Sequence, residues 1–149
     1  MHPALVALPV GLLTGTVLAD IAYLFISKNQ MWLDISFWTN AAGVVTALIA
    51  AVFGFIDYFG IAHGAARKPA TLHMVLNLVM VTLFAGALFA FPYGQAAPNI
   101  LVPFTLQFLG FALMMGAGYL GGELVFTHKL GVLEDQEPAA REREKSTVA

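Results

Sequence analysis

The sequence predicts an all-α membrane protein: a bundle of four transmembrane helices with short loops and a polar C-terminal tail. Of the 149 residues, 59% are hydrophobic and only 11% are charged, and the hydrophobic residues fall into four continuous runs. A water-soluble domain carries about a quarter charged residues, so this composition disfavours a soluble globular enzyme. The runs are also too continuous for the alternating ~10-residue strands of a β-barrel.

The apolar runs predict membrane spans at residues 3–26, 36–61, 70–91 and 100–126, within one domain of residues 1–133. Each run reaches the roughly 20 apolar residues that a helix needs to cross a bilayer. Polar or helix-breaking segments separate them: a turn at 27–35, HGAARKP at 63–69 and PYGQAAPN at 92–99. Residues 134–149 are charge-dense without apolar periodicity, which predicts a disordered cytoplasmic tail.

Basic residues indicate the orientation. We call the membrane side that holds the N-terminus side A and the opposite side B. With four spans, side A holds all but one of the basic residues, namely Arg67, Lys68, Lys129, Arg141, Arg143 and Lys145. Side B holds only Lys28. Cytoplasmic loops are enriched in Lys and Arg, which predicts a multi-pass protein of a bacterial-type inner membrane with both termini in the cytoplasm.

The four histidines, His2, His63, His73 and His128, all fall at side A when the chain is threaded through four spans. His73 lies inside an apolar stretch (TLHMVLNL), and Asn77 follows it on the same helical face. Polar groups inside a membrane usually face the bundle interior, so we expect His73 to point inward. There is no cysteine, so any metal or haem needs other ligands.

Acidic residues inside the spans are further candidates. Asp57 continues a helical stripe of small and polar residues, which predicts that it projects inward at side A. Near side B, Asp20, Asn40 and residues early in the fourth span predict a second polar cluster, either a structural clasp or part of a proton path. The fourth span contributes Thr105 and Gln107 to this predicted cluster.

The fourth span ends in a glycine-rich segment that contains Glu123 (GGELVF). A glutamate at this depth is costly unless it is paired or reaches the membrane surface. The Gly118-x-x-x-Gly122 step predicts close packing of this helix against a neighbour.

Four segments spread over the chain carry a family resemblance: HPALVALP, GFIDYFGI, TLHMVLNL and GGELVFTHKLGV. With them, the chain resembles over about residues 2–132 a known family of four-helix membrane proteins, DUF2231, whose name denotes a domain of unknown function. The last histidine is usually followed by glycine in that family, whereas this chain has Lys129. The resemblance implies the four-helix topology. Related chains occur alone or fused to redox modules such as Rieske-type domains, which implies electron transfer.

The first functional hypothesis is a membrane protein that binds haem b. Imidazole nitrogens can hold a haem between bundle helices without covalent attachment. His73 and His128 are the preferred axial pair, with His2 as an alternative, and the propionates would lie near Arg67 and Lys68.

A transition-metal site is chemically as reasonable. Its ligands would be His2, Asp57, His73 and His128, with Asn77 supporting the ring of His73. Either cofactor would point to electron transfer with a membrane redox partner.

Two hypotheses from other classes stay open. In the first, the chain is a non-catalytic accessory or structural subunit of a membrane complex, and its polar groups fix helix register. In the second, it is a small proton-handling transporter that uses Asp57 and Asp20 and acts as a homo-oligomer. No basic patch favours nucleic acid.

The orientation is testable with a reporter. A cytoplasm-active reporter fused after Ala149 should be active, because the basic residues hold side A in the cytoplasm. The same reporter inserted after Lys28 should be inactive. Activity of the Lys28 fusion together with periplasmic location of the C-terminus would contradict the predicted orientation.

Overall fold

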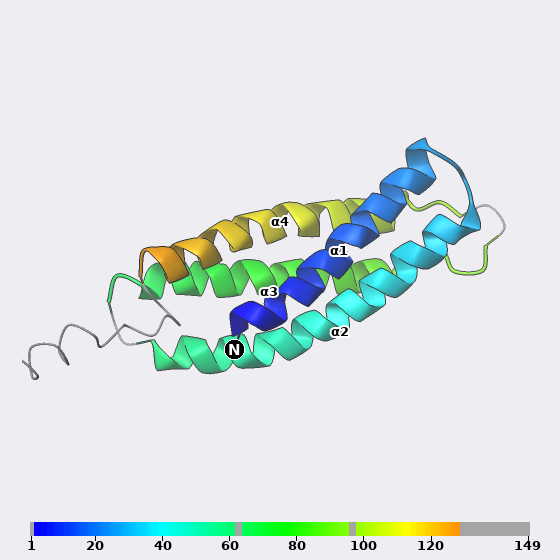
Figure 1. Ribbon diagram of the computed structural model, residues 1–149. Helices are drawn as coiled ribbons and strands as arrows, with labels where there is room; N and C mark the ends of the chain where they lie inside the picture. The colour runs from blue at the N-terminus through cyan, green and yellow to red at the C-terminus, as the bar shows by residue number, and fades with distance from the viewer. Residues whose placement is uncertain (1, 62–63, 96–97, 129–149) are drawn as a thin grey trace, which may run out of the picture.

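The computed structural model describes residues 2–61, 64–95 and 98–128, and of residues 2–4 it describes the backbone alone (Figure 1). Within these ranges the chain forms helices and no strand; the helices are α1 (His2–Phe25), α2 (Gln30–Gly60), α3 (Arg67–Phe89) and α4 (Leu101–Phe126). Each is long and apolar enough to cross a membrane. The predicted four-helix membrane fold is therefore confirmed, while the predicted tail at 134–149 lies outside the described ranges.

The helices run alternately up and down as two hairpins. α1 packs mainly on α2 and α3 mainly on α4, with fewer contacts between α2 and α3 and between α1 and α4. The start of α1, the end of α2, the start of α3 and the end of α4 lie at one end of the bundle, which is side A (Figure 1). Short connections between long helices favour this antiparallel arrangement.

Two helices begin earlier than predicted. α2 begins at Gln30 rather than at residue 36. Its polar first residues, which suggested a loop, cap the helix: the Asn29 side chain accepts a hydrogen bond from the Met31 backbone N–H at 2.9 Å. Gln30 Nε2 also donates to Asp34 Oδ1 at 3.1 Å, one turn along the new helix.

α3 begins at Arg67 rather than at residue 70. Pro69 then lies in the first turn, where the missing N–H has no intrahelical partner to lose. This earlier start places His73 nearly two turns inside the helix instead of one, about 9 Å from its first residue at the usual helical rise.

Two apolar clusters form the core. The central cluster consists of buried side chains from all four helices: Leu13, Val17, Val44, Met80, Phe84 and Met114. The side-B cluster is smaller and consists of Tyr23, Leu33 and Ile100, with Trp32, Leu24 and Phe91 packed against it. Along α1, α2 and α4, polar residues lie between these two clusters.

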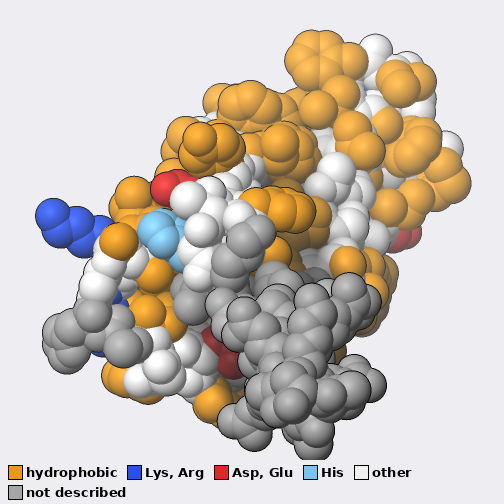
Figure 2. All heavy atoms as spheres, turned by 60° about the vertical axis from the view of Figure 1, so that its left-hand side comes forward, with side chains coloured by type: hydrophobic (Ala, Val, Ile, Leu, Met, Phe, Trp, Pro, Cys, Tyr) orange, Lys and Arg blue, Asp and Glu red, His pale blue; other side chains and the backbone are white. Residues whose placement is uncertain are grey.

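The flank of the bundle is apolar, as expected for a surface in contact with lipid. Figure 2 shows hydrophobic side chains over most of the visible flank, with few charged side chains between them. On α2 alone, large exposed side chains include Val45, Leu48, Ile49, Val52, Ile56 and Phe59. Trp38 and Tyr93 contact Phe37 near side B, as expected for aromatic anchors at a membrane interface.

Close helix packing depends on glycines other than the predicted pair. A Cβ atom at Gly118 would meet no atom within 4 Å, and one at Gly122 would meet only Phe126 of the same helix at 4.0 Å. The prediction that this pair packs against a neighbouring helix of the bundle is therefore wrong. A Cβ at Gly110 would instead lie 2.8 Å from the ring of Phe84, and one at Gly43 would lie 2.5 Å from Leu13.

Gly110→Ala should destabilise the bundle by about 1–3 kcal/mol, because the new methyl group would overlap the fully buried ring of Phe84. Gly118→Ala on the same helix is the matched control and should be neutral or stabilising, since its methyl group meets open space. Thermal unfolding in detergent measures both. Equal unfolding temperatures for the two variants would contradict the close approach of α3 and α4 at Gly110.

Candidate functional site

A layer of buried polar side chains crosses the bundle between the two apolar clusters. Asp20 is 1% exposed, and Ser36, Asn40 and Gln107 are each 0% exposed. We call these four residues the polar layer. They come from α1, α2 and α4, and residue spacing along these helices places them at a similar depth of the membrane domain. Of the residues predicted to form a second polar cluster near side B, Asp20, Asn40 and Gln107 are therefore buried, whereas Thr105 is exposed.

Hydrogen bonds next to the layer fix the helices around it. The hydroxyl groups of Thr16 and Thr39 are 2.9 Å apart, which joins α1 to α2. Asn40 Nδ2 donates to the backbone carbonyl of Phe84 at 3.2 Å, which joins α2 to α3. This bond fixes the orientation of the Asn40 side chain, whose oxygen Oδ1 has no hydrogen-bond partner.

Most polar atoms of the layer have no hydrogen-bond partner. The unpartnered buried atoms are both carboxylate oxygens of Asp20, Ser36 Oγ, Asn40 Oδ1, and Gln107 Oε1 and Nε2. Ser36 is the side chain that interacts with Asp20 across the α1–α2 interface, but without a well-formed hydrogen bond. An unsatisfied buried polar group costs about 1–3 kcal/mol and more when it is charged, so the layer is held together at an energetic cost.

The layer is close to side B and far from side A. On α1, Tyr23 of the side-B cluster lies three residues beyond Asp20, about 4.5 Å along the helix. On α2, Leu33 precedes Ser36 by the same spacing. Towards side A, the central cluster and the remaining helical turns separate the layer from water. Along α1 and α2, the thinner barrier between the polar layer and water is therefore the side-B cluster.

His73 points into the bundle, as the sequence predicts, and it contacts α4. Its Nδ1 lies 2.8 Å from the backbone carbonyl oxygen of Ala117. A carbonyl only accepts hydrogen bonds, so Nδ1 carries the proton. Nε2 is then an acceptor, and Asn77 Nδ2 donates to it at 3.2 Å while also donating to the His73 carbonyl at 2.8 Å. The imidazole thus joins α3 to α4.

Gly121 makes room for this imidazole. A Cβ atom at position 121 would lie 3.2 Å from Cε1 of His73 and 3.5 Å from its Nδ1. His128 is half-buried and lies seven residues further along the chain, just past the end of α4. His128 therefore lies beyond the last turn of α4, with its backbone N–H bonded to the Glu123 carbonyl, whereas the His73 imidazole of α3 packs on α4 at Gly121.

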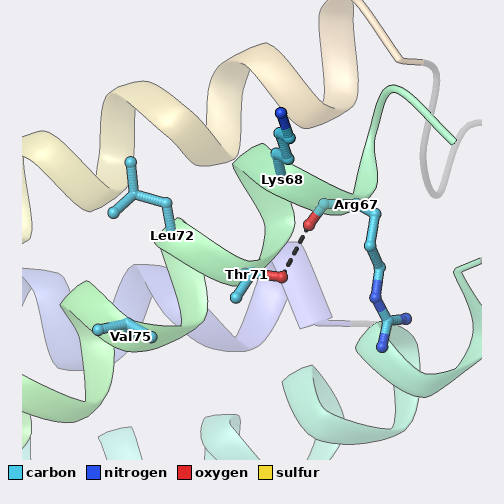
Figure 3. A pocket seen from close by; sticks show the side chains of 5 residues that line it. All are labelled: Arg67, Lys68, Thr71, Leu72 and Val75. Atoms are coloured by element: carbon cyan, nitrogen blue, oxygen red, sulfur yellow. Dashed lines mark hydrogen bonds between the residues drawn. The ribbon is translucent and has the colours of Figure 1, made fainter. Parts of the chain in front are cut away.

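Arg67 and Lys68 line the same open hollow at the start of α3, but their side chains point in different directions (Figure 3). The Arg67 guanidinium donates to the carbonyls of Tyr58 and Ile61 at the end of α2, at 3.1 Å each, and lies 4.1 Å from the centre of the Tyr58 ring. A cation at a helix C-terminus is favourable, so Arg67 clamps α2 to α3. Lys68 is exposed and lines an open hollow of about 350 Å³ on α3 with Leu72 and Val75.

Asp57 is exposed, so the prediction that it projects into the bundle is wrong. The register of the first hairpin gives the reason. Leu13 of α1 packs on Gly43 of α2, and in an antiparallel pair the first residue of α1, His2, is then level with about residue 54. Asp57 lies beyond the start of α1, where this helix cannot cover it.

The remaining predicted residues are only partly placed. Glu123 is half-buried on α4. The side chain of His2 and all of His63 lie outside the described residues, so whether His2 meets His73 and His128 stays a prediction. Among the residues that the structure describes, no group of three or more His, Cys, Asp or Glu side chains could hold a metal ion.

Sequence reasoning missed Ser36 and Thr16. Both hydroxyl residues are common in membrane helices and draw no attention alone. The available signal was spacing: Thr16 precedes Asp20 by four residues and Ser36 precedes Asn40 by four. Two such pairs on adjacent antiparallel helices place four polar side chains on facing stripes.

The chain belongs to the DUF2231 family of predicted membrane proteins, whose family model matches residues 1–134. This match agrees with the four membrane-spanning helices. No curated protein and no solved structure matches the chain.

Proposed function

We propose that this member of the DUF2231 family handles protons, with Asp20 in the polar layer taking up and releasing one proton. The observation that carries the proposal is the set of buried, unpartnered polar atoms around Asp20. A bare carboxylate in an apolar interior is very costly, so an ionised Asp20 would need a compensating positive charge nearby. Protonation removes the charge and gives the carboxyl an O–H donor. The carbonyl oxygens of Asn40 and Gln107 supply acceptors in the same layer.

The accessory-subunit hypothesis explains the layer less well. A clasp that only fixes helix register would satisfy its members within the bundle, as Thr16 and Thr39 do. Within the layer, only Asn40 makes such a bond, and it makes it to the backbone of Phe84. A half-satisfied network is less stable than an apolar core, which favours a role for the layer beyond packing.

The position of the layer suggests the side from which protons arrive. The barrier of Tyr23, Leu33 and Ile100 begins about one helical turn from Asp20 and Ser36 along α1 and α2, so exchange through side B is the shorter route. With the termini in the cytoplasm of a bacterial-type cell, as the basic residues predict, side B faces the periplasm. Asp57, the other acidic residue considered for proton transfer, is exposed at the opposite end.

Infrared spectroscopy of the full chain in lipid tests this function. The difference spectrum between acidic and alkaline samples should contain the C=O band of a buried carboxylic acid, and Asp20→Asn should remove that band. Asp34→Asn is the matched control, because Asp34 lies near the same membrane side but accepts a hydrogen bond from Gln30. A spectrum that Asp20→Asn leaves unchanged would refute proton binding at Asp20.

A second candidate function is binding of haem b or a transition metal at His73, with His128 and His2 as further ligands. The favouring observation is the bond from Nδ1–H of His73 to the Ala117 carbonyl. Metal-binding imidazoles are commonly oriented by such a bond from the other ring nitrogen. Nε2 would take the ligand once Asn77 keeps only its bond to the His73 carbonyl. A bound haem or redox metal would supply electron transfer with a membrane redox partner.

Spectra and metal analysis of the purified protein test this candidate. If the site exists, His73→Ala should remove most of the haem or metal, because it deletes the imidazole that α3 holds against α4. His63→Ala, in the polar segment HGAARKP, should change little. Absence of both a Soret band and stoichiometric metal after expression with each supplied would reject the candidate.

A further inference from the structure

We infer that the polar layer is also a coordination site for an alkali-metal cation, with Na⁺ as the probe, in which Asp20 supplies the charge. This inference rests on the proposed role of the layer and names a second occupant that competes with the proton. The layer consists of four buried side chains on three helices, and each has at least one oxygen atom without a hydrogen-bond partner: Asp20, Ser36, Asn40 and Gln107.

The balance of donors and acceptors favours a cation. Five of the six unpartnered atoms are oxygens: two of Asp20 and one each of Ser36, Asn40 and Gln107. The donors in the layer are the Ser36 hydroxyl and the Gln107 amide, which carry three hydrogens, whereas the carboxylate alone can accept about four. One N–H of the Asn40 amide is bonded to the Phe84 carbonyl, and the other brings the available donor hydrogens to four, against about ten lone-pair positions on the five oxygens. Acceptors therefore exceed donors, which is the pattern that an oxygen-preferring cation satisfies.

The charge balance favours a monovalent cation. Asp20 is the one acidic side chain of the layer, and no basic side chain contributes to it. The nearest titratable neighbour on α1 is Tyr23, and Lys28 Nζ lies 4.7 Å from the centre of its ring. The other helices contribute only uncharged groups to the layer, namely Ser36, Asn40, Gln107 and the backbone of Phe84. One carboxylate neutralises one Na⁺, whereas a divalent ion would leave a net positive charge in the membrane.

The layer also resembles the general setting of cation sites in membrane proteins. Such sites lie inside the membrane domain, at helix interfaces, where polar groups would otherwise be expensive. Here the interface joins the two hairpins: Asp20, Ser36 and Asn40 belong to the first, and Gln107 belongs to the second. A bound cation would therefore connect hairpins that otherwise share few contacts.

Na⁺-dependent stability tests the inference. The full chain in detergent should show an unfolding temperature that rises and saturates with NaCl at alkaline pH, against choline chloride at equal ionic strength. Asp20→Asn should abolish this shift, and Gln107→Leu should weaken the apparent Na⁺ affinity at least tenfold. Thr105→Val on the same helix is the matched control, since its exposed hydroxyl bonds only to Leu101.

A charge variant gives a second, independent readout. Gln107→Glu adds a second carboxylate, so the layer should then prefer Ca²⁺ to Na⁺ in the same assay. Equal stabilisation by NaCl and choline chloride in the native chain would overturn the cation site. If Na⁺ does not stabilise the chain but the infrared band of Asp20 is present, the proton proposal stands and the cation site is rejected. If Na⁺ stabilises the chain but the band is absent, the cation site stands and the proton proposal fails.

Discussion

The burial of the Asp20 carboxyl inside a membrane-spanning bundle constrains much of the remaining structure. The side chain is 1% exposed, and the helices that surround it offer amide and hydroxyl groups rather than a cation. Water cannot screen a charge at that place, so its energy depends on what the bundle supplies. The arrangement of Ser36, Asn40 and Gln107 at the same depth is best understood as the environment of this one carboxyl.

The surrounding packing maintains that environment. The central cluster fills the bundle towards side A, and the close approach of α3 and α4 at Gly110 presses Phe84 into the core. The same Phe84 residue offers its carbonyl to Asn40. Because α3 is tightly packed at Phe84, the carbonyl that accepts a hydrogen bond from Asn40 is held in place. The orientation of the Asn40 side-chain oxygen therefore depends on the packing of the Phe84 ring.

Sequence reasoning predicted the topology because each span is a long apolar run, a signal that needs no tertiary information. It also placed Asp20, Asn40 and Gln107 at one depth, since depth follows from helical rise. It failed where the answer depended on register or caps. The exposure of Asp57 follows from the contact of Leu13 with Gly43, and the early start of α2 follows from the Asn29 cap. The Leu13–Gly43 contact joins two helices and cannot be read from the sequence, whereas the Asn29 cap is a local helix-start signal that the prediction overlooked.

Polar groups near the two ends of the bundle differ in how far their hydrogen bonds are satisfied. Towards side A, the ring of His73 is bonded to Ala117 and Asn77, and Arg67 is bonded to two carbonyls of α2. These groups join helices by satisfied hydrogen bonds, which is what structural polar residues in a membrane achieve. The layer near side B has the residue types for such bonds but leaves its oxygens unpaired. Because both ends belong to one chain, this contrast separates polar residues that hold helices together from polar residues whose hydrogen-bonding capacity is not used within the bundle.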